Sequence, residues 1–551
     1  MPWLSAIYGA EEAAVRAELS ATWPAAQQRR QDPLLAEALS WPALLPKLPL
    51  PFPVSADTPP SPKHRYRCHY AYLGYGELHD PAAWARLSLF DLALCLIDFA
   101  GLEATLAMVL YAPSAKGHTP FHPVSLFLLH TWRILNGWGR CEALRQLAAP
   151  RNDDYRQRFG FKPGAYPTEG GLRYFETRLG AGASNDLIAQ SVALAKAASC
   201  IAQGAIEHAI LGVDGMLHDA ASRVRCRYVD DACYQPAPRP CAAKAKGQKG
   251  CDCNEVACRQ VCEHATPRDP EARLVIYAGH NRGDSPNAPV GEAGNSKPPR
   301  GKARYGYRSL CVRLIDLRRR TSWVLGDDLL AANAPEDQAA TVLLTQVVAS
   351  YGWAHWEFAV ADAGEGREPF LSTAYRLGLR RVVGLRAAES DGDEQLWAIR
   401  GYDDKGIPVC PHGYRLSANG WDEQRRRHKW CCRRVCEQEK QGPAPECPHR
   451  FDGDKHGLVK DVGRTFADGS SRLVRDVPYG GALWKQLYGR ARNAAEERNA
   501  ELEGWGLKRL PVYGSWRARA VILVADMWVN LLTVVRLVRE AVLAAGGLSP
   551  P

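Results

Sequence analysis

The stretch that decides the fold is ILGVDGMLHD at residues 210–219, in which Asp214 comes directly after an apolar run. A second stretch, WEFAVADAGEGREPF at residues 356–370, places Asp362 after a similar run. Short apolar runs of this kind predict buried strands. One acidic residue after a strand is most often a turn or capping residue. Two of them, followed by a third acid, have the layout of a carboxylate triad that could hold metal ions.

The third acid lies in LYGRARNAAEERNAELEGWGLKR at residues 487–509, which has a helical pattern. Helical positions four before and three after a residue share its face, so Arg492, Glu496 and Asn499 lie together. The neighbouring Glu497 points about 100° away from that face. We therefore choose Glu496 as the third acid. For Arg492 two roles stay open, an ion pair with Glu496 or a contact with a phosphate.

The composition allows more than one domain and favours a polyanionic partner without proving one. The chain has 551 residues, 46% of them hydrophobic, and a net charge of +10. The N-terminal residues read as amphipathic, so we expect no signal peptide. Two long apolar stretches, 92–112 and 520–535, resemble membrane spans in length. Because each carries acidic or amide residues, we expect buried helices instead (Asp98, Glu103, Asp526 and Asn530).

The first 204 residues read as mostly helical. Residues 1–63 comprise a helical segment and a proline-rich linker from Trp41 to Lys63. Residues 64–204 predict an all-α domain, in which Thr168 caps one helix and Gly180 comes just past its end. A further helix is expected from Asn185 to Ile210. Arginines along these helices form either a solvated basic face or a DNA-contacting one (Arg133, Arg140, Arg145, Arg151, Arg156, Arg158, Arg173 and Arg178).

From residue 205 to residue 540 the pattern changes to a mixed α/β order. Two polar, cysteine-rich segments, at about 224–302 and 389–480, interrupt it, and we treat them as insertions outside the sheet. The remaining stretches predict strands at 209–217, 305–315, 321–325, 358–362 and 381–385, and helices at 335–351, 369–378 and 488–502.

The three acids suit phosphodiester chemistry. Two divalent ions about 3.5–4 Å apart can activate an attacking oxygen and stabilise the leaving one. Mg²⁺ prefers hard oxygen ligands, and carboxylates from separate elements provide them. We expect Asp214 and Asp362 at the ends of neighbouring parallel strands, with Glu496 reaching them from a helix.

The ordered series VDG, YGYRS, LAANAPEDQAATVLL, VADAG, LYGRARNAAEERN and GLKRLPVYGSWRARAVILVADMWVNLL resembles the DDE transposases of bacterial insertion sequences. The resemblance covers roughly residues 205–535. It implies a ribonuclease H-like catalytic domain whose metal-binding acids are Asp214, Asp362 and Glu496. The Tyr-Arg-Glu-Lys pattern of that family would fall on Glu496 and on three residues that contact DNA phosphates: Tyr488, Arg492, with Arg490 as a rival, and Lys508.

The resemblance implies a transposase that binds the terminal inverted repeats of its element and catalyses strand cleavage and strand transfer with two Mg²⁺ or Mn²⁺ ions. It implies double-stranded DNA as partner, a homodimer in the synaptic complex, and a bacterial, nucleoid-associated location in the cytoplasm. Two alternatives stay open: a non-catalytic, zinc-stabilised DNA-binding protein derived from such an enzyme, and a nuclease of the same fold without strand transfer.

The 17 cysteines are clustered, which in an intracellular protein favours metal thiolates over disulfides. Structural Zn²⁺ takes four thiolate or imidazole ligands from short loops. One candidate set lies in the second insertion (Cys410, Cys432, Cys436 and Cys447), and another in the first (Cys251, Cys253, Cys258 and Cys262). Free or buried thiols are the alternative for both sets.

Overall fold

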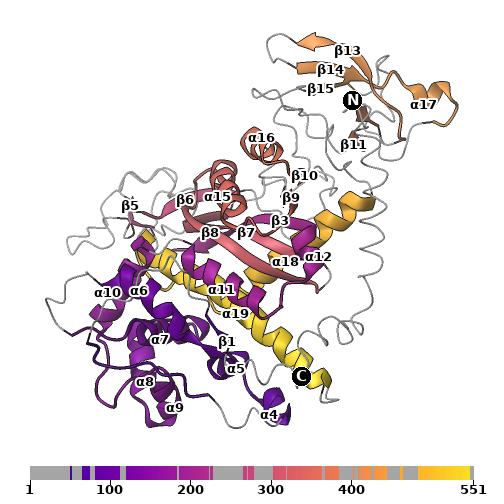
Figure 1. The fold of residues 1–551 in the computed structure, drawn as a ribbon. Helices are drawn as coiled ribbons and strands as arrows, with labels where there is room; N and C mark the ends of the chain where they lie inside the picture. The colour runs from indigo at the N-terminus through magenta and orange to yellow at the C-terminus, as the bar shows by residue number, and fades with distance from the viewer. Residues whose placement is uncertain are drawn as a thin grey trace, which may run out of the picture.

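The computed structural model describes most of the helical region, the central sheet and parts of both cysteine-rich segments (Figure 1). The described residues are 50–52, 65–74, 81–111, 119–182, 185–221, 224–226, 265–267, 269, 271–277, 302–317, 319–362, 367–383, 401–402, 407–410, 412–422, 427–442, 459–462 and 482–545. The expected helical segment at residues 1–40 lies outside them.

A mixed sheet of six strands forms the centre of the protein (Figure 1). Its order is β10-β9-β3-β7-β6, and β8 also pairs with β7. The strands are β3 (Ala209–Asp219), β6 (Arg273–Tyr277), β7 (Lys302–Asp316), β8 (Thr321–Ala331), β9 (Trp356–Ala361) and β10 (Arg380–Val383). The predicted mixed α/β class is therefore confirmed.

Strand direction follows from the connections. β7 and β8 are antiparallel and joined by a tight turn, in which the Asp316 carboxylate accepts the Arg319 N–H at 2.9 Å. β9 and β10 run parallel to β3, so each needs a crossover connection. The crossovers are the helices α15 (Glu336–Ser350) and α16 (Glu368–Arg376). The helix expected from residue 335 begins at Glu336, and Pro335 is its N-cap residue.

Helices cover both faces of the sheet. On one face lies α18 (Ala482–Gly504), whose Leu487, Ala491 and Ala494 are buried against apolar side chains of β3, β9 and β10. On the other face α15 packs over β7 and β8, with Leu343 and Val347 next to the position of Gly326. Successive side chains along each strand therefore point alternately to the helices on one face and to those on the other.

The N-terminal region is helical, as predicted. Its elements are α4 (Pro81–Arg86), α5 (Leu89–Leu96), η4 (Phe99–Leu102), α6 (Glu103–Leu110), α7 (Pro123–Leu135), α8 (Arg140–Ala148), η5 (Pro150–Asn152), α9 (Asp153–Arg158), α10 (Glu169–Gly182), α11 (Asp186–Ala197) and α12 (Gln203–Glu207). Thr168 does cap α10, because its hydroxyl accepts the Gly171 N–H at 3.1 Å.

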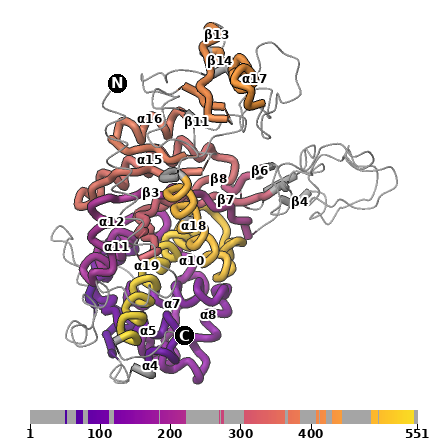
Figure 2. The backbone as a smooth tube through the Cα atoms, turned by 90° about the vertical axis from the view of Figure 1, so that its right-hand side faces the viewer, coloured from indigo at the N-terminus to yellow at the C-terminus, as the bar shows by residue number. Residues whose placement is uncertain are grey.

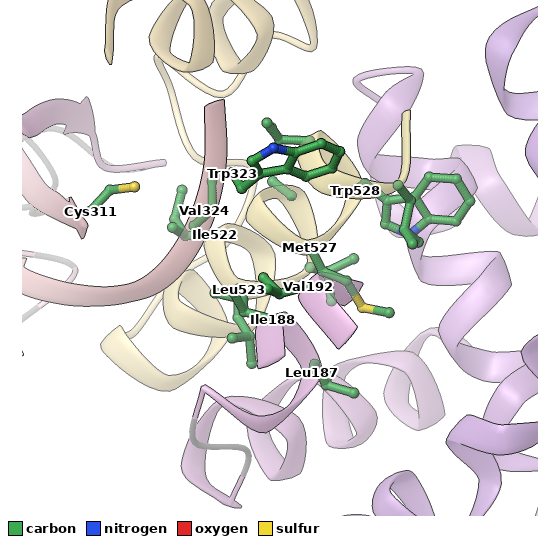
Figure 3. Close-up of a cluster of buried hydrophobic side chains, with 14 of the residues drawn as sticks. Leu187, Ile188, Val192, Cys311, Trp323, Val324, Ile522, Leu523, Met527 and Trp528 are labelled. Atoms are coloured by element: carbon green, nitrogen blue, oxygen red, sulfur yellow. The ribbon is translucent and has the colours of Figure 1, made fainter. Parts of the chain in front are cut away.

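The long helix α19 (Ser515–Ala545) joins this region to the sheet, since it packs against α10, α11, α5 and β8 (Figure 2). Figure 3 shows Leu523, Met527 and Trp528 of α19 among side chains of α11 and β8. Among the described helices α19 alone is long and apolar enough to cross a membrane, yet 89% of its apolar stretch is buried inside the protein. This agrees with the predicted buried helix.

Leu50–Pro51 (β1), in the expected extended linker, pairs in parallel with Ile97–Asp98 (β2), and Phe52 beside them is buried. Two expectations about segment boundaries were wrong. The expected helix from Asn185 to Ile210 breaks after α11, where Ser199 has a φ of +56°. Residues 273–277, expected in an insertion, form β6 of the central sheet through pairing with β7.

Other parts of the two cysteine-rich segments form small sheets apart from the central one. β4 (Val224–Cys226) pairs with β5 (Ala265–Pro267). In the second segment β11 (Gly401–Tyr402) pairs with β12 (Pro408–Val409). Three further strands and a short helix complete the second segment: β13 (Ser417–Asp422), β14 (Arg427–Cys431), β15 (Val459–Val462) and α17 (Val435–Gln438). Both views place this segment at the opposite end of the molecule from α4 and α5 (Figures 1 and 2).

Gly180 lies inside α10 rather than past its end, and the reason is a helix crossing. A Cβ atom at Gly180 would lie 1.7 Å from the Trp516 carbonyl oxygen in the first turn of α19. No real Cβ approaches backbone that closely, so only glycine allows the two helix axes to cross at this separation.

We predict that Gly180→Ala destabilises the protein by about 1–3 kcal/mol, because overpacking at a backbone contact outweighs the better helix propensity of alanine. Thermal or urea denaturation measures the change. Gly170→Ala is the matched control, since a Cβ there meets only the Thr168 hydroxyl at 3.8 Å. Equal stability of the two variants would contradict the proposed reason for Gly180.

Candidate active site

Asp214 and Asp362 come from neighbouring strands and line the same pocket. Val213 of β3 pairs with Ala361 of β9, and the pairing ends there, so each aspartate is the next residue. The pocket is open to solvent, and the space in and in front of it amounts to about 290 Å³. Asp362 follows β9 as expected, but Asp214 lies within β3, which continues to Asp219 paired with β7. The pocket therefore lies at the C-terminal end of β9 and beside the middle of β3.

The helix α18 closes the other side of the pocket with Tyr488, Ala491 and Arg492. The Tyr488 hydroxyl donates to Asp362 Oδ1 at 2.9 Å. Arg492 Nη1 lies 2.9 Å from the same oxygen. These residues share one face of α18 because they are four positions apart. The first turns of the helix are thus tied to the end of β9 by two donors on one carboxylate.

Arg492 also contacts Glu496, with its Nε 3.6 Å from Oε1. The ion pair expected from the i to i+4 spacing is therefore present, and it extends to Asp362. All three side chains remain about half exposed, at 45% for Asp362, 47% for Arg492 and 48% for Glu496. Solvent screens such pairs, so Arg492 balances the charge of the two carboxylates more than it stabilises the fold.

Asp214 is held differently, by an amide. Asn499 Nδ2 donates to Asp214 Oδ2 at 2.8 Å, and Asn499 lies on the same face of α18 as Arg492. Burial raises the pKa of Asp214, while the hydrogen bond from Asn499 and the charge of Arg498 act in the opposite direction. The carboxylate therefore lies in a site where a further positive charge would be favourable.

The Tyr488 hydroxyl keeps its proton near neutral pH and acts as a hydrogen-bond donor. Burial, and then the negative charge of Asp362, raise the pKa of Tyr488 to about 12. Burial lowers the pKa of Arg492. The hydrogen bond to Asp362 and the charge of that carboxylate outweigh burial, so the pKa of Arg492 lies above its usual value. Both side chains therefore keep their protons near neutral pH and can only donate to an anion in the pocket.

The donor set fits a hard divalent cation, because the pocket presents two carboxylates from adjacent strands. Glu496 is linked to this pair through Arg492 rather than directly. Within the part of the chain that the structure describes, no three His, Cys, Asp or Glu side chains form a group close enough for a metal ion. For Glu496 to join the aspartates as a ligand, its contact with Arg492 would have to be exchanged for one with the ion.

Lys508, expected to contact a phosphate, does not line the pocket. It lies in the turn after α18, where its ammonium group pairs with Glu503 at 2.6 Å. Its carbonyl accepts the N–H of Asp219, at the far end of β3 from Asp214. The structure thus brings Tyr488 and Arg492 to the aspartates and leaves Lys508 apart, and a role for it in binding DNA stays a prediction.

The candidate zinc ligands are only partly within the described residues. Cys410 is buried with Leu416, and Cys432 packs against this small cluster. Cys436 is half-buried, and the structure places it near Tyr414 together with Cys410. The fourth candidate, Cys447, lies outside the described residues, as do all four of the other set: Cys251, Cys253, Cys258 and Cys262. Structural zinc at either set stays a prediction.

Most of the arginines in the N-terminal helices have acidic partners. Arg133 and Arg140 share the buried carboxylate of Glu176, at 2.7 Å and 2.6 Å. Further pairs join Arg145 to Glu142, Arg156 to Asp153 and Arg158 to Asp154. Arg173 and Arg178 are exposed on α10. The pairing reduces the net charge of this surface, so a DNA contact by the helical region stays a prediction that rests on few residues.

Behind Asp214 lies a cluster of four buried polar residues that was not identified from the sequence. They are His218, Ser309, Arg498 and Asp526, each no more than 1% exposed. Asp526 did give a signal, because a carboxylate in a long apolar helix must find a partner. That partner is Arg498, whose Nε and Nη2 each lie 2.7 Å from an Asp526 oxygen.

Neither the protein-family models, nor the curated proteins, nor the solved structures compared with the chain give a match.

Asp327, on β8, is a fifth buried polar residue and lies opposite Cys311 of β7, which in turn pairs with Asp214. It is 1% exposed, and neither of its carboxylate oxygens has a hydrogen-bond partner among the described residues. Burial, and then the charge of Asp526, raise the pKa of Asp327 to about 8, while Arg519 and Arg498 oppose this. Asp327 therefore holds a proton at neutral pH.

We predict that Asp327 makes stability depend on pH. An unfolded aspartate has a pKa of about 3.9, so the folded protein holds a proton that the unfolded chain releases. This contribution to stability is complete below that pKa and is lost as the pH rises through about 8. Asp327→Asn should therefore show a smaller fall in melting temperature than the wild type between about pH 5 and pH 8.

The matched control is Asp328→Asn, at the adjacent and partly exposed position, which should keep the pH dependence of the wild type. Identical melting curves for Asp327→Asn and the wild type at every pH would show that Asp327 is ionised in the folded protein.

Proposed function

We propose that the protein is a DDE-type transposase that cleaves and joins DNA strands with a ribonuclease H-like catalytic core. One observation carries the proposal: Asp214 and Asp362, distant in sequence, line one pocket together with side chains of α18, the helix that bears Glu496. Two acids of the resemblance thus share one pocket, and Arg492 connects Asp362 with the third, Glu496.

The arrangement of the strands supports a ribonuclease H-like core. An antiparallel unit, β3-β7-β8, is extended beyond β3 by the parallel strands β9 and β10. In this sheet the strand that carries Asp214 lies in the middle, and the strand that ends before Asp362 lies beside it. Their aspartates therefore become neighbours although they lie 148 positions apart in the sequence, at residues 214 and 362. A helix that crosses this face of the sheet can add a third acid.

In the proposed reaction a hydroxyl oxygen of water or of a DNA 3′ end attacks a phosphorus atom. A new phosphorus–oxygen bond forms, and the bond to the leaving oxygen breaks in line with it. Two divalent cations of the Mg²⁺ type would supply activation of the attacking oxygen and stabilisation of the leaving one. Asp214 and Asp362 would hold them, with Glu496 as the third carboxylate.

The other side chains of the pocket have roles that follow from their contacts. Tyr488 fixes the orientation of Asp362 by donating to Oδ1. Arg492 is half exposed at the pocket, and its guanidinium has more N–H donors than the one that contacts Asp362. A phosphate oxygen that enters the pocket could therefore accept a hydrogen bond from Arg492 and pair with its charge. Such an exchange would also release Glu496 from its contact with Arg492. The Arg492 guanidinium would thus balance the charge of the acids before DNA binds and the charge of the DNA phosphate afterwards.

The nuclease alternative shares this site and differs only in whether cut ends are joined to a target. The alternative of a non-catalytic DNA-binding protein is less favoured, because an idle site has no need for Asp362 and Asp214 to line one open pocket. The family resemblance favours strand transfer. We further propose binding of terminal inverted repeats, synapsis as a homodimer, and structural zinc in the cysteine-rich segments.

We predict that Asp214→Asn and Asp362→Asn each reduce Mg²⁺-dependent cleavage of DNA that carries the element's ends by at least about 100-fold, because each removes a charge that holds the metal ions. Binding of the same DNA, measured by gel shift, should be retained. Joining of the cut ends to a target, measured in the same reactions, separates the transposase from the nuclease.

The control is Asp219→Asn, on the same strand but outside the pocket, where the carboxylate lies 3.8 Å from Arg304. It should cleave like the wild type. Cleavage at the wild-type rate by the Asp214 or Asp362 variant would refute the assignment of the site.

A further inference from the structure

A chain of buried hydrogen bonds lies directly behind Asp214. Asn499 is its first member and contacts two groups through its two amide atoms. Nδ2 donates to Asp214 Oδ2 at 2.8 Å, and Oδ1 accepts from Arg498 Nη1 at 3.1 Å. The two neighbours fix which way the amide points. Guanidinium has only donors and a carboxylate has only acceptors, so the oxygen must face Arg498 and the nitrogen must face Asp214.

Arg498 cannot turn away from Asn499, because its other donors are taken. It is 1% exposed and bonds Asp526 through both Nε and Nη2, at 2.7 Å each. Its Nη1 also donates to the Ser309 hydroxyl at 3.0 Å. A planar guanidinium held at three corners has one orientation. The atom that faces Asn499 is therefore fixed by α19 and β7 rather than by α18 alone.

The far end of the chain has the same directional consistency. His218 Nδ1 lies 2.8 Å from the Leu507 carbonyl oxygen, so it must carry the proton. His218 Nε2 is then an acceptor, and the Ser309 hydroxyl, 2.8 Å away, donates to it. That leaves a lone pair of Ser309 for Arg498. Burial lowers the pKa of His218 to about 3, so the imidazole stays neutral and the direction of each bond is preserved.

We propose that Asn499 is a positioning residue for Asp214, and that the Arg498–Asp526 pair acts through it by fixing its amide. The proposal rests on the proposed function, in which Asp214 holds a divalent cation. Outer-shell hydrogen bonds orient a metal-ligating carboxylate, and their loss typically weakens metal binding by about 10–100-fold. Because Asn499 donates to Oδ2, the Asp214 carboxylate is held in one orientation relative to the pocket.

The test measures Mn²⁺ binding to the full chain by titration followed with electron paramagnetic resonance, which needs no DNA and no turnover. Asn499→Ala removes the donor, and Asn499→Leu removes it while keeping the approximate volume of the side chain. Both variants should raise the Mn²⁺ dissociation constant by about 10-fold or more. A residue that only packed would be replaced adequately by leucine, so equal weakening in both variants indicates the hydrogen bond.

Asn493→Ala is the matched control, an asparagine exposed on the same helix. It should bind Mn²⁺ like the wild type, and the Asn493 and Asn499 variants should melt close to the wild-type temperature. Arg498→Lys tests the second step. Lysine keeps the charge for Asp526 but cannot fill the three corners of the guanidinium, so Mn²⁺ binding should weaken although Asn499 is intact.

Two failures are distinguishable. If Asp214→Asn binds Mn²⁺ as tightly as the wild type, Asp214 is not a metal ligand and the proposed function itself fails. If Asp214→Asn loses binding while both Asn499 variants bind like the wild type, only the positioning role is overturned. Wild-type binding by Arg498→Lys, with weakened binding in the Asn499 variants, would limit the role to Asn499.

Discussion

The buried ion pair between Arg498 and Asp526 is the interaction on which the rest of the structure depends. Removing two charges from water is costly, and it is offset only when each charge finds its partner in good geometry. Here both side chains are at most 1% exposed and share two hydrogen bonds. The pair joins the helix that carries the pocket side chains to the helix around which the N-terminal region packs. Loss of either partner would leave a lone buried charge, at a cost of about 3–5 kcal/mol.

The sequence was sufficient where the pattern is local. Apolar runs identified β3 and β9, and the helical period placed Glu496 and Arg492 on one face, where the structure shows their contact. It was insufficient where the reason lies in another segment. Gly180 reads as a helix end until Trp516 is known to cross it, and β6 reads as part of an insertion until β7 is seen beside it. The role of Asn499 likewise needs both Asp214 and Arg498 in place.

The two aspartates of the candidate site differ in what surrounds them. Asp362 is about half exposed and is met by the half-exposed guanidinium of Arg492 and by the hydroxyl of Tyr488. Asp214 is more enclosed and is met by an amide whose own partner is buried. A phosphate of the proposed substrate would compete with Asp362 for Arg492, whereas the buried Arg498 holds Asn499 towards Asp214. In the proposed reaction this asymmetry would let Asp214 define the position of the site while Asp362 responds to what enters it.

The pairing of β6 with β7 bears on how the chain between β3 and β7 can vary. The chain leaves the core after Ala220, whose N–H is bonded to the Tyr305 carbonyl of β7, and it returns through β6 to the same strand. Both ends of this excursion are thus fastened to one strand. The entropy cost of a loop grows slowly, by about 0.6 kcal/mol for each doubling of its length. Segments of very different length could therefore be exchanged between these two anchors during evolution without moving Asp214.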